Sequence, residues 1–196
     1  MIIGMGSSPV AWQLRRMGKI PPNLLLYPEF FDDKRALLKG GWRPYVRALI
    51  RHRQKIRMAL YPDYATATLT MSVPRNIEYV VPVHDLSAFE VVDRLLSDNY
   101  IAWAGYASDP KYRNYTMDGF LSAADGRGIW YLGASTMHEL REAILNNFGG
   151  VDVTGYILGN NNTRRDARLA AAKVREIALR VASVEGRQVR LMEVSV

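Results

Sequence analysis

The chain has 196 residues, of which 48% are hydrophobic and 23% charged, the balance of a globular protein and not of a disordered or fibrous one. It has no cysteine and three histidines, which excludes disulfides and thiolate metal sites and predicts no zinc site. A formal net charge of +7 favours a polyanionic partner, either nucleic acid or a phosphorylated small molecule, although net charge can also serve solubility alone.

Neither a membrane span nor a targeting segment is predicted. No apolar run approaches the roughly 18 to 20 residues needed to cross a bilayer, and residues 1–6 lack the charged start and cleavage pattern of a signal peptide. We therefore expect a cytoplasmic protein without a membrane partner. No linker divides the chain, so we expect one domain over residues 1–196, and no motif points to a cofactor.

Eight short runs rich in apolar, β-branched or aromatic residues predict strands. They are residues 2–5, 24–27, 56–61, 79–83, 101–106, 129–132, 153–158 and 189–194. Because strands that alternate with helices form a parallel sheet, we predict a compact (β/α)8 TIM-like barrel. Such barrels usually need about 250 residues, so some βα units should have degenerate helices, at residues 65–76 and 108–128. An open doubly wound sheet is the alternative.

Helix starts show the capping-box pattern, in which a hydroxyl and a carboxylate each bind an otherwise unpaired backbone N–H. The pattern occurs at residues 87–90, 136–139 and 163–166, and the last should open a long helix. Between the second and third predicted strands, Asp33 should cap a short helix that ends at Gly40. Pro44 suits the first turn of another helix with Val46 and Leu49 on its apolar face.

Functional groups of a barrel lie where its strands end and the following loops begin. Asp63 follows the third predicted strand beside Tyr64, a possible stacking surface; the carboxylate could bind a purine-like base, act as a general base, or cap the next loop. His84 could bind or shuttle a proton at the end of the fourth strand, or hydrogen-bond a loop carbonyl. Gly105 and Gly133 either admit a ligand to the backbone or relieve crowding.

Two groups of basic and amide residues suggest anion binding. The loop after the seventh predicted strand leads into a helix N-terminus, a position where barrels often hold phosphate. Its candidate phosphate or nucleic-acid contacts are Asn160, Asn162, Thr163, Arg164 and Arg165, and a polar loop with exposed arginines is the competing interpretation. Basic residues also cluster between residues 43 and 57 and along the last helix, where they either follow a nucleic-acid backbone or form a solvated face.

Several segments share the pattern of a known family. They are residues 131–140 (YLGASTMHEL), 150–158 (GVDVTGYIL) and 162–165 (NTRR), which resemble the C-terminal part of tRNA-guanine (queuine) transglycosylases. Residues 101–108 resemble that family's base-binding strand more loosely. The resemblance implies a barrel that exchanges guanine in tRNA, or in DNA among related proteins, for a 7-deazaguanine base through a covalent aspartyl intermediate. It implies base contacts for Asp63, His84 and Gly105, with Tyr64 and Tyr106 as neighbouring candidates.

The chain departs from this family at its catalytic positions. In an ungapped alignment the nucleophilic aspartate falls on Gly155, and Asp152 matches only the preceding acid. The serine-glycine-glycine motif is absent, with Glu29 the nearest candidate acid, and the zinc-binding cysteines are missing. A glycine cannot form the glycosyl ester. Either Asp63 or Asp152 supplies the carboxylate, or the protein binds without exchange.

The leading hypothesis is a divergent, zinc-free transglycosylase-like protein that binds or exchanges a guanine or 7-deazaguanine base in nucleic acid. Its candidate catalytic residues are Asp63, Asp152 and Glu29. One alternative is a phosphate-binding barrel enzyme, an isomerase or lyase acting on a small phosphorylated metabolite. The other is a non-catalytic barrel that binds nucleic acid.

Overall fold

The computed structural model describes residues 1–18, 20–33, 42–62, 73–159 and 161–194. Its centre is a parallel sheet of eight strands in the order β2-β1-β8-β7-β6-β5-β4-β3. The strands are β1 (Ile2–Met5), β2 (Leu24–Leu26), β3 (Phe30–Phe31), β4 (Met58–Leu60), β5 (Glu78–Val83), β6 (Ala102–Ala107), β7 (Ile129–Leu132) and β8 (Gly150–Asp152). The sheet curls into a nearly closed barrel, which confirms the predicted TIM-like α/β class.

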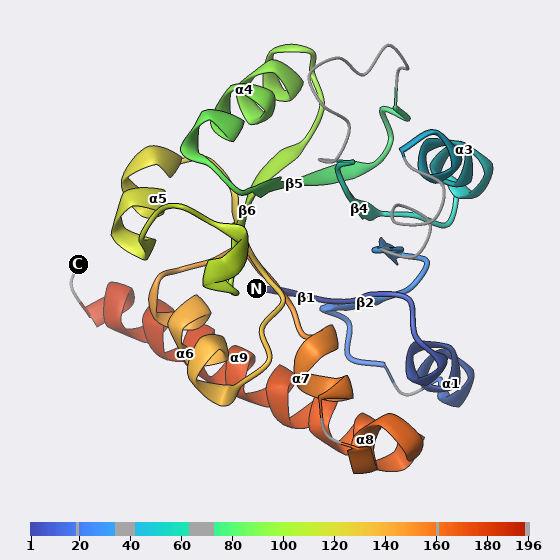
Figure 1. Cartoon of the computed structure of the whole chain (residues 1–196). Coiled ribbons are helices and arrows are strands. Elements are labelled where there is room, and N and C mark those ends of the chain that lie inside the picture. The colour runs from blue at the N-terminus through green and yellow to red at the C-terminus, as the bar shows by residue number, and fades with distance from the viewer. Residues whose placement is uncertain (19, 34–41, 63–72, 160, 195–196) are drawn as a thin grey trace.

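Helices surround this sheet, as Figure 1 shows. Most connect one strand to the next: α1 (Pro9–Met17), α3 (Trp42–His52), α4 (Phe89–Ser97), α5 (Met117–Ala124) and α6 (Met137–Leu145). Three follow β8: α7 (Thr154–Leu158), α8 (Asn161–Arg165) and α9 (Ala167–Val194). Single turns of 3-10 helix precede α4 and α5, namely η1 (Leu86–Ala88) and η2 (Pro110–Tyr112). Among the described residues no helix is both long and apolar enough to cross a membrane.

The two edges of the sheet are consecutive in the chain. β2 pairs with β1 and β3 pairs with β4, while Tyr27, Pro28 and Glu29 join them. Parallel neighbours need a crossover of about a dozen residues, so β2 and β3 form no ladder with each other. The chain instead leaves the β1 ladder at Leu26 and enters the β4 ladder at Phe30, which brings the sheet almost to closure. This connection has no helix, although the degenerate units were expected at other connections.

Alternate side chains of the strands fill the barrel interior. They form a cluster separate from the larger layer between sheet and helices, and its members are Ile2, Leu25, Phe30, Met58, Leu60, Val80, Trp103, Trp130 and Leu132. Phe30 stacks on Trp130 with ring centroids 5.3 Å apart. A Cβ atom on Gly150 would lie 2.1 Å from the Trp130 ring, and one on Gly4 would lie 3.0 Å from Phe30. These glycines therefore make room for aromatic rings in a narrow barrel.

Two predicted strands were wrong and two real ones were not predicted. Residues 153–158 contain α7, and residues 189–194 lie within α9. A short apolar run does not distinguish a strand from a buried helix by periodicity alone. The unpredicted strands are β3, with two residues, and β8, in which Gly150 shortens the apolar pattern.

The helix starts also differ from prediction in part. The box at Thr136 and Glu139 is confirmed. At residues 87–90 no box forms: Asp85 caps η1 through the Ser87 N–H, and α4 has no side-chain cap. At residues 163–166, Thr163 lies inside α8 and its hydroxyl donates to the Ile157 carbonyl, while Asp166 accepts from the Arg168 N–H at the start of α9.

The connections between strands bear on the remaining predictions. The helix α3 carries Pro44, Val46 and Leu49 as predicted. Residues 108–128, predicted to be too poor for a full helix, contain η2 and the eight-residue α5. The short helix expected between Asp33 and Gly40 and most of the connection at residues 65–76 lie outside the described residues.

Candidate functional site

All eight strands are parallel, so their carboxyl ends lie at one end of the barrel, which we call the mouth. Active sites of TIM barrels are built at this end. Among the described residues, the mouth includes Gly6 after β1, Asp32 after β3, His84 after β5, Gly133 after β7 and Asp152 at the end of β8.

Asp152 is buried, with 4% of its surface exposed. Its neighbour Val151 packs in the layer under the helices, so the alternation of the strand turns Asp152 toward the barrel interior. Its Oδ1 accepts hydrogen bonds from Thr154, from the backbone N–H at 2.9 Å and from the hydroxyl at 2.5 Å. The Thr154 Oγ1 in turn accepts from the Gly6 N–H at 2.8 Å. These contacts fix the carboxylate at the junction of β8 and β1.

Asp32 is a second buried carboxylate, with 7% of its surface exposed. Its carbonyl accepts from the Ser7 N–H at 3.1 Å, and a Cβ atom on Gly6 would lie 3.0 Å from Asp32 Oδ2. The Cα atom of Gly6 thus faces the Asp32 carboxylate, and the Gly6 N–H donates to Thr154, which in turn donates to Asp152. Two carboxylates that flank one glycine can divide acid, base or nucleophilic roles.

Asp32 was not among the predicted site residues. The sequence signal for it is the run Phe30-Phe31-Asp32-Asp33, two aromatic residues followed by acids, but a strand of two residues is too short to recognise.

The loops after β7 and β8 lie together. The Ala134 N–H donates to the Asp152 carbonyl at 2.9 Å, and the Tyr156 N–H donates to the Ala134 carbonyl at 3.0 Å. Gly133 has φ +75°, a conformation that favours glycine. Many barrels bind phosphate between these two loops, so the donors available here decide whether an anion can bind.

Several of those donors already form hydrogen bonds with carboxylates of the chain itself. Glu139 Oε2 accepts from the backbone N–H and the hydroxyl of both Ser135 and Thr136, at 2.8 to 2.9 Å. Burial alone would raise the pKa of Glu139, but these hydrogen bonds together lower it below its usual value. The Thr154 N–H is bound to Asp152. A phosphate at this place would meet two carboxylates.

His84 lies at the rim of the mouth, half-buried. Its Nδ1 is 2.6 Å from the Tyr112 carbonyl oxygen, so this nitrogen carries the proton and donates. The Asn114 N–H donates to the His84 carbonyl at 3.2 Å, and the Asn114 amide donates to Asp85. Hydrogen bonds from Asn114 and Ser87 lower the pKa of Asp85 to about 2. These contacts hold the loop after β6 against the end of β5.

Three other predicted site residues lie elsewhere. A Cβ atom on Gly105 would lie 2.7 Å from Leu132 Cδ1, so interior packing explains this glycine. Tyr106 is 2% exposed and packs in the layer between sheet and helices, where its ring does not line the mouth. Glu29 is half-exposed and pairs with Arg15 of α1 at 3.3 Å.

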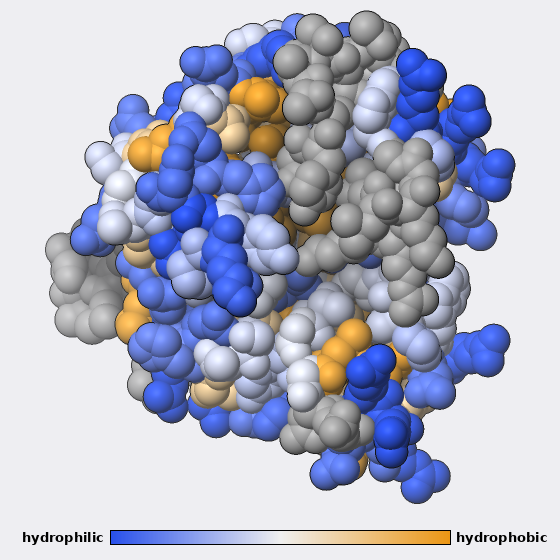
Figure 2. All heavy atoms as spheres, in the orientation of Figure 1, coloured by the Kyte–Doolittle hydropathy of each residue, from blue (hydrophilic) through white to orange (hydrophobic). Residues whose placement is uncertain are grey.

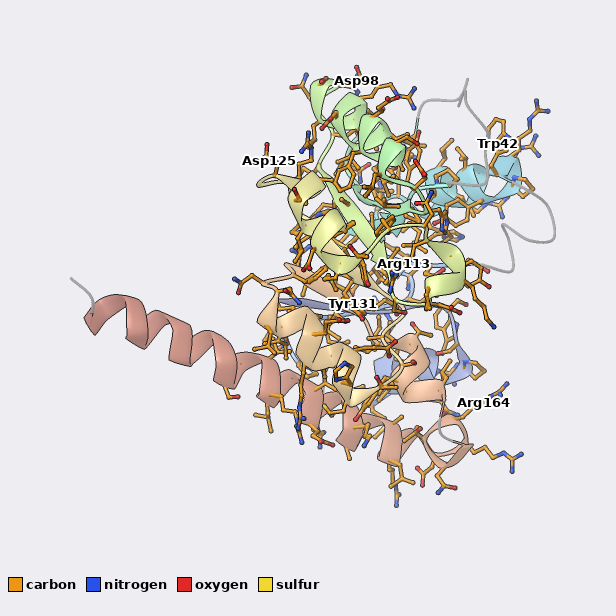
Figure 3. The ribbon with its side chains drawn as sticks, turned by 60° about the vertical axis from the view of Figure 1, so that its left-hand side comes forward. Trp42, Asp98, Arg113, Asp125, Tyr131 and Arg164 are labelled. Atoms are coloured by element: carbon orange, nitrogen blue, oxygen red, sulfur yellow. The ribbon has the colours of Figure 1, made fainter. Side chains whose placement is uncertain are left out.

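The predicted anion-binding segment does not adjoin a strand end. Residues 161–165 form α8, and α7 separates α8 from β8. Thr163 is buried, whereas Asn162, Arg164 and Arg165 are exposed, and Figure 3 shows Arg164 at the outer edge of the molecule. Asp63, Tyr64 and Asn160 lie outside the described residues.

Of the candidate acids, the structure therefore places Asp152 at the mouth, and it adds Asp32 next to Gly6 at the same end of the barrel. Within the described part of the chain, no group of three or more histidine, aspartate or glutamate residues is arranged to hold a metal ion.

Comparison with known proteins gives one relative over nearly the full length. No family model matches the chain. Among solved structures it is similar to thiamine phosphate pyrophosphorylase from Pyrococcus furiosus, at 13% identity and a TM-score of 0.47, over 90% of this chain and 96% of that one. The likeness to transglycosylases thus stays a resemblance of a few segments. Over 192 residues the chain is 38% identical to the uncharacterized protein ORF192 of Acidianus two-tailed virus, covering 97% of this chain and 98% of the relative. The chain belongs to the same protein family as this viral ORF192.

Proposed function

We propose that this protein binds a guanine-type base of a nucleic acid at the barrel mouth and exchanges it, using Asp152 and Asp32 as its two carboxylates. The observation that carries this proposal is that both buried carboxylates connect to Gly6 at the carboxyl ends of the strands, Asp32 directly and Asp152 through Thr154. The net charge of +7 supports a polyanionic substrate.

The chemistry of a carboxylate suits such a base. Exchange of a base needs a nucleophile at C1′ and a proton donor for the departing base, and two carboxyl groups can supply both. Near the carboxyl end of β7, Leu132 is only partly buried and offers an apolar contact for the ring. A base must leave the helical stack to reach this position, as in other enzymes that act on bases.

The exchange needs one nucleophile and one proton donor. In our proposal a carboxylate oxygen of Asp152 attacks C1′ of the nucleotide, which forms an ester and breaks the C1′–N9 bond. Asp32, which starts the reaction as the protonated carboxylic acid, donates the proton that the departing base requires. In the second half of the reaction the incoming base gives its N9 proton to Asp32, attacks C1′ and releases Asp152.

The contacts of the β7 and β8 loops favour this function over the alternative of a phosphorylated metabolite. Glu139 and Asp152 occupy donors that would otherwise bind phosphate. A carboxylate in this position repels an anion but attracts the N–H edge of a base. The alternative predicts binding of small phosphorylated metabolites that depends on Arg164 and Arg165.

The test is incorporation of labelled guanine into tRNA and into duplex DNA. We expect the wild-type protein to incorporate label, Asp152→Asn to lose at least roughly 10³-fold of the rate, and Asp32→Asn to lose about 10² to 10⁴-fold. Asp125→Asn is the matched control, because Asp125 is an exposed helix cap with φ +40°, a conformation that asparagine tolerates. Guanine binding by calorimetry separates the two halves of the proposal. Binding without incorporation would contradict base exchange, and absence of both would contradict base binding as well.

A further inference from the structure

One exposed region of the chain carries positive charge only. Between residues 42 and 57 there is no aspartate or glutamate. The basic residues there are all exposed, and we call them the cationic face: Arg43, Arg47, Arg51, Arg53, Lys55 and Arg57. Figure 2 shows hydrophilic side chains projecting over α3, where this face lies.

The helical spacing aligns the first three of these residues. Arg43, Arg47 and Arg51 are four residues apart, so they lie on one side of α3 with a rise of roughly 6 Å between successive residues. The buried residues Tyr45 and Leu49 lie on the opposite side of this helix. The arrangement is a straight row of guanidinium groups on the outside of the barrel.

The charges of this row are not neutralised by described residues. On the cationic face, the ion pair among described residues is Arg57 with Glu78 at 3.4 Å. The long helix α9 is different: Glu176 pairs with Lys173 at 3.8 Å and with Arg180 at 3.0 Å. Mixed charges of the α9 kind are typical of a solvated helix face. The α3 row instead has the character of a surface for a polyanion.

From this pattern we infer that the cationic face binds the phosphate backbone of a nucleic-acid duplex. Guanidinium groups bind phosphate oxygens in pairs, and a row of them can follow successive phosphates. Proteins that hold single strands add aromatic surfaces for unstacked bases. On α3 the Trp42 ring is covered by Arg43, 5.3 Å from its centroid, and Tyr45 is buried. The described residues of this face therefore suit contact with the phosphate backbone of a nucleic acid better than stacking with its bases.

The helix that carries the cationic face is anchored at the strand ends by its buried side. The Tyr45 hydroxyl donates to the carbonyls of Phe31 at 3.0 Å and Leu60 at 2.8 Å, the last residues of β3 and β4. The start of α3 therefore lies near the end of β3, which Asp32 follows. Arg43 is the arginine of the row that comes first in the helix. This inference deepens the proposed function and rests on it for the kind of partner.

The experiment measures fluorescence anisotropy of a labelled 20-base-pair duplex against salt concentration. We expect the triple variant Arg43→Gln, Arg47→Gln, Arg51→Gln to bind at least roughly tenfold more weakly near 0.1 M salt, with a logarithmic salt slope reduced by about 2 to 3. The control is Arg168→Gln, Arg175→Gln, Arg180→Gln, which removes the same charge from α9. Equal weakening by both triple variants would show that only net charge matters and would overturn the inference.

Further arms separate this inference from its competitors and from the proposed function. Tighter binding of a single strand of the same length, or binding of phosphatidylserine vesicles without binding of the duplex, would also overturn it. Asp152→Asn should bind the duplex as the wild type does, and the α3 triple variant should still bind free guanine. Loss of duplex binding with guanine binding intact therefore concerns the cationic face alone, and loss of guanine binding alone concerns the mouth.

Discussion

The interior of the barrel and its mouth occupy alternate positions of the same strands, two residues apart, yet they obey different rules. On β3 the interior residue is Phe30 and the mouth residue is Asp32; on β8 they are Gly150 and Asp152. Inside, aromatic rings fill the space that glycines leave. At the mouth, the Asp152 carboxylate accepts from the Thr154 hydroxyl, and the Thr154 oxygen accepts from the Gly6 N–H of another loop.

The difference shows which property of a side chain matters at each kind of position. In the interior the volume of a side chain decides, because no neighbouring atom can move away. At the mouth the hydrogen-bonding capacity decides, and a side chain of the same shape can take the place of another. Changes of size should therefore be most damaging inside, and changes of charge should affect function more than stability at the mouth.

The largest effect is expected for Gly150→Ala. The added methyl group would lie 2.1 Å from the ring of the buried Trp130, which is stacked on Phe30 and cannot turn away. We expect a loss of about 3 kcal/mol or more in the free energy of unfolding, the upper part of the range for overpacking. Chemical denaturation followed by far-ultraviolet circular dichroism measures it.

Gly119→Ala is the matched control for that substitution. Gly119 lies in α5, and the nearest atom to its new methyl group would be Thr116 Oγ1 at 3.4 Å, an ordinary contact. Alanine is the better helix former, so this variant should be more stable by about 0.4 to 1 kcal/mol. A similar loss in both variants would mean that the interior is not tightly packed around Gly150.

The second effect concerns Asp152 at the mouth. Asp152→Ala leaves the Thr154 N–H without its acceptor and should lower the free energy of unfolding by about 1 to 3 kcal/mol. Asp152→Asn keeps an acceptor oxygen of the same shape, and its stability should stay near that of the wild type while base exchange is lost. Thermal unfolding of the two variants measures the contrast. If asparagine destabilises as much as alanine, the charge is structural and the division between interior and mouth fails.

A smaller effect is expected at the helix that follows β7. Thr136 and Glu139 form the capping box of α6, and the Thr136 hydroxyl accepts from the Glu139 N–H at 3.2 Å. Thr136→Ala should lower the free energy of unfolding by about 1 kcal/mol. Ser87→Ala is the comparison: no capping box forms at Ser87, and because its hydroxyl bonds only the exposed Asp85, its effect should stay within about 0.5 kcal/mol. Equal effects would contradict the observed caps.

The barrel class could be predicted from sequence because it depends on repeated local patterns. The strand at residues 129–132 was predicted with the bounds that β7 has, since its apolar run is clear and Gly133 ends it. The capping box at Thr136 is likewise a local pattern. For residues 153–158 the local pattern was ambiguous, and packing against the loop after β7 selects a helix.

The candidate site could be predicted only in part, because it depends on contacts between distant segments. Asp152 is named by the family resemblance, but its place at the mouth depends on Thr154, whose contact with the Gly6 N–H spans 148 residues. Asp32 becomes a partner only when β3 joins β4 and the Ser7 N–H meets its carbonyl. Tyr106 shows the converse: its place in the chain suggests the mouth, while strand alternation turns it into the core.

The smallest effect is expected at the rim, where Asp85 is exposed. Its pKa in the folded protein is about 2, below the unperturbed value of 3.8, because Asn114 and Ser87 donate hydrogen bonds to the carboxylate. A depressed pKa contributes stability that is present above about pH 4 and is lost as the pH falls toward 2. Asp85→Asn should remove this part of the acid dependence, and Asn114→Ala should move the Asp85 titration upward. Carboxyl carbon chemical shifts in nuclear magnetic resonance follow the titration directly. A midpoint near 3.8 in the wild type would mean that the loop after β6 is not held to β5 in solution, and that the order of the mouth does not extend to its rim.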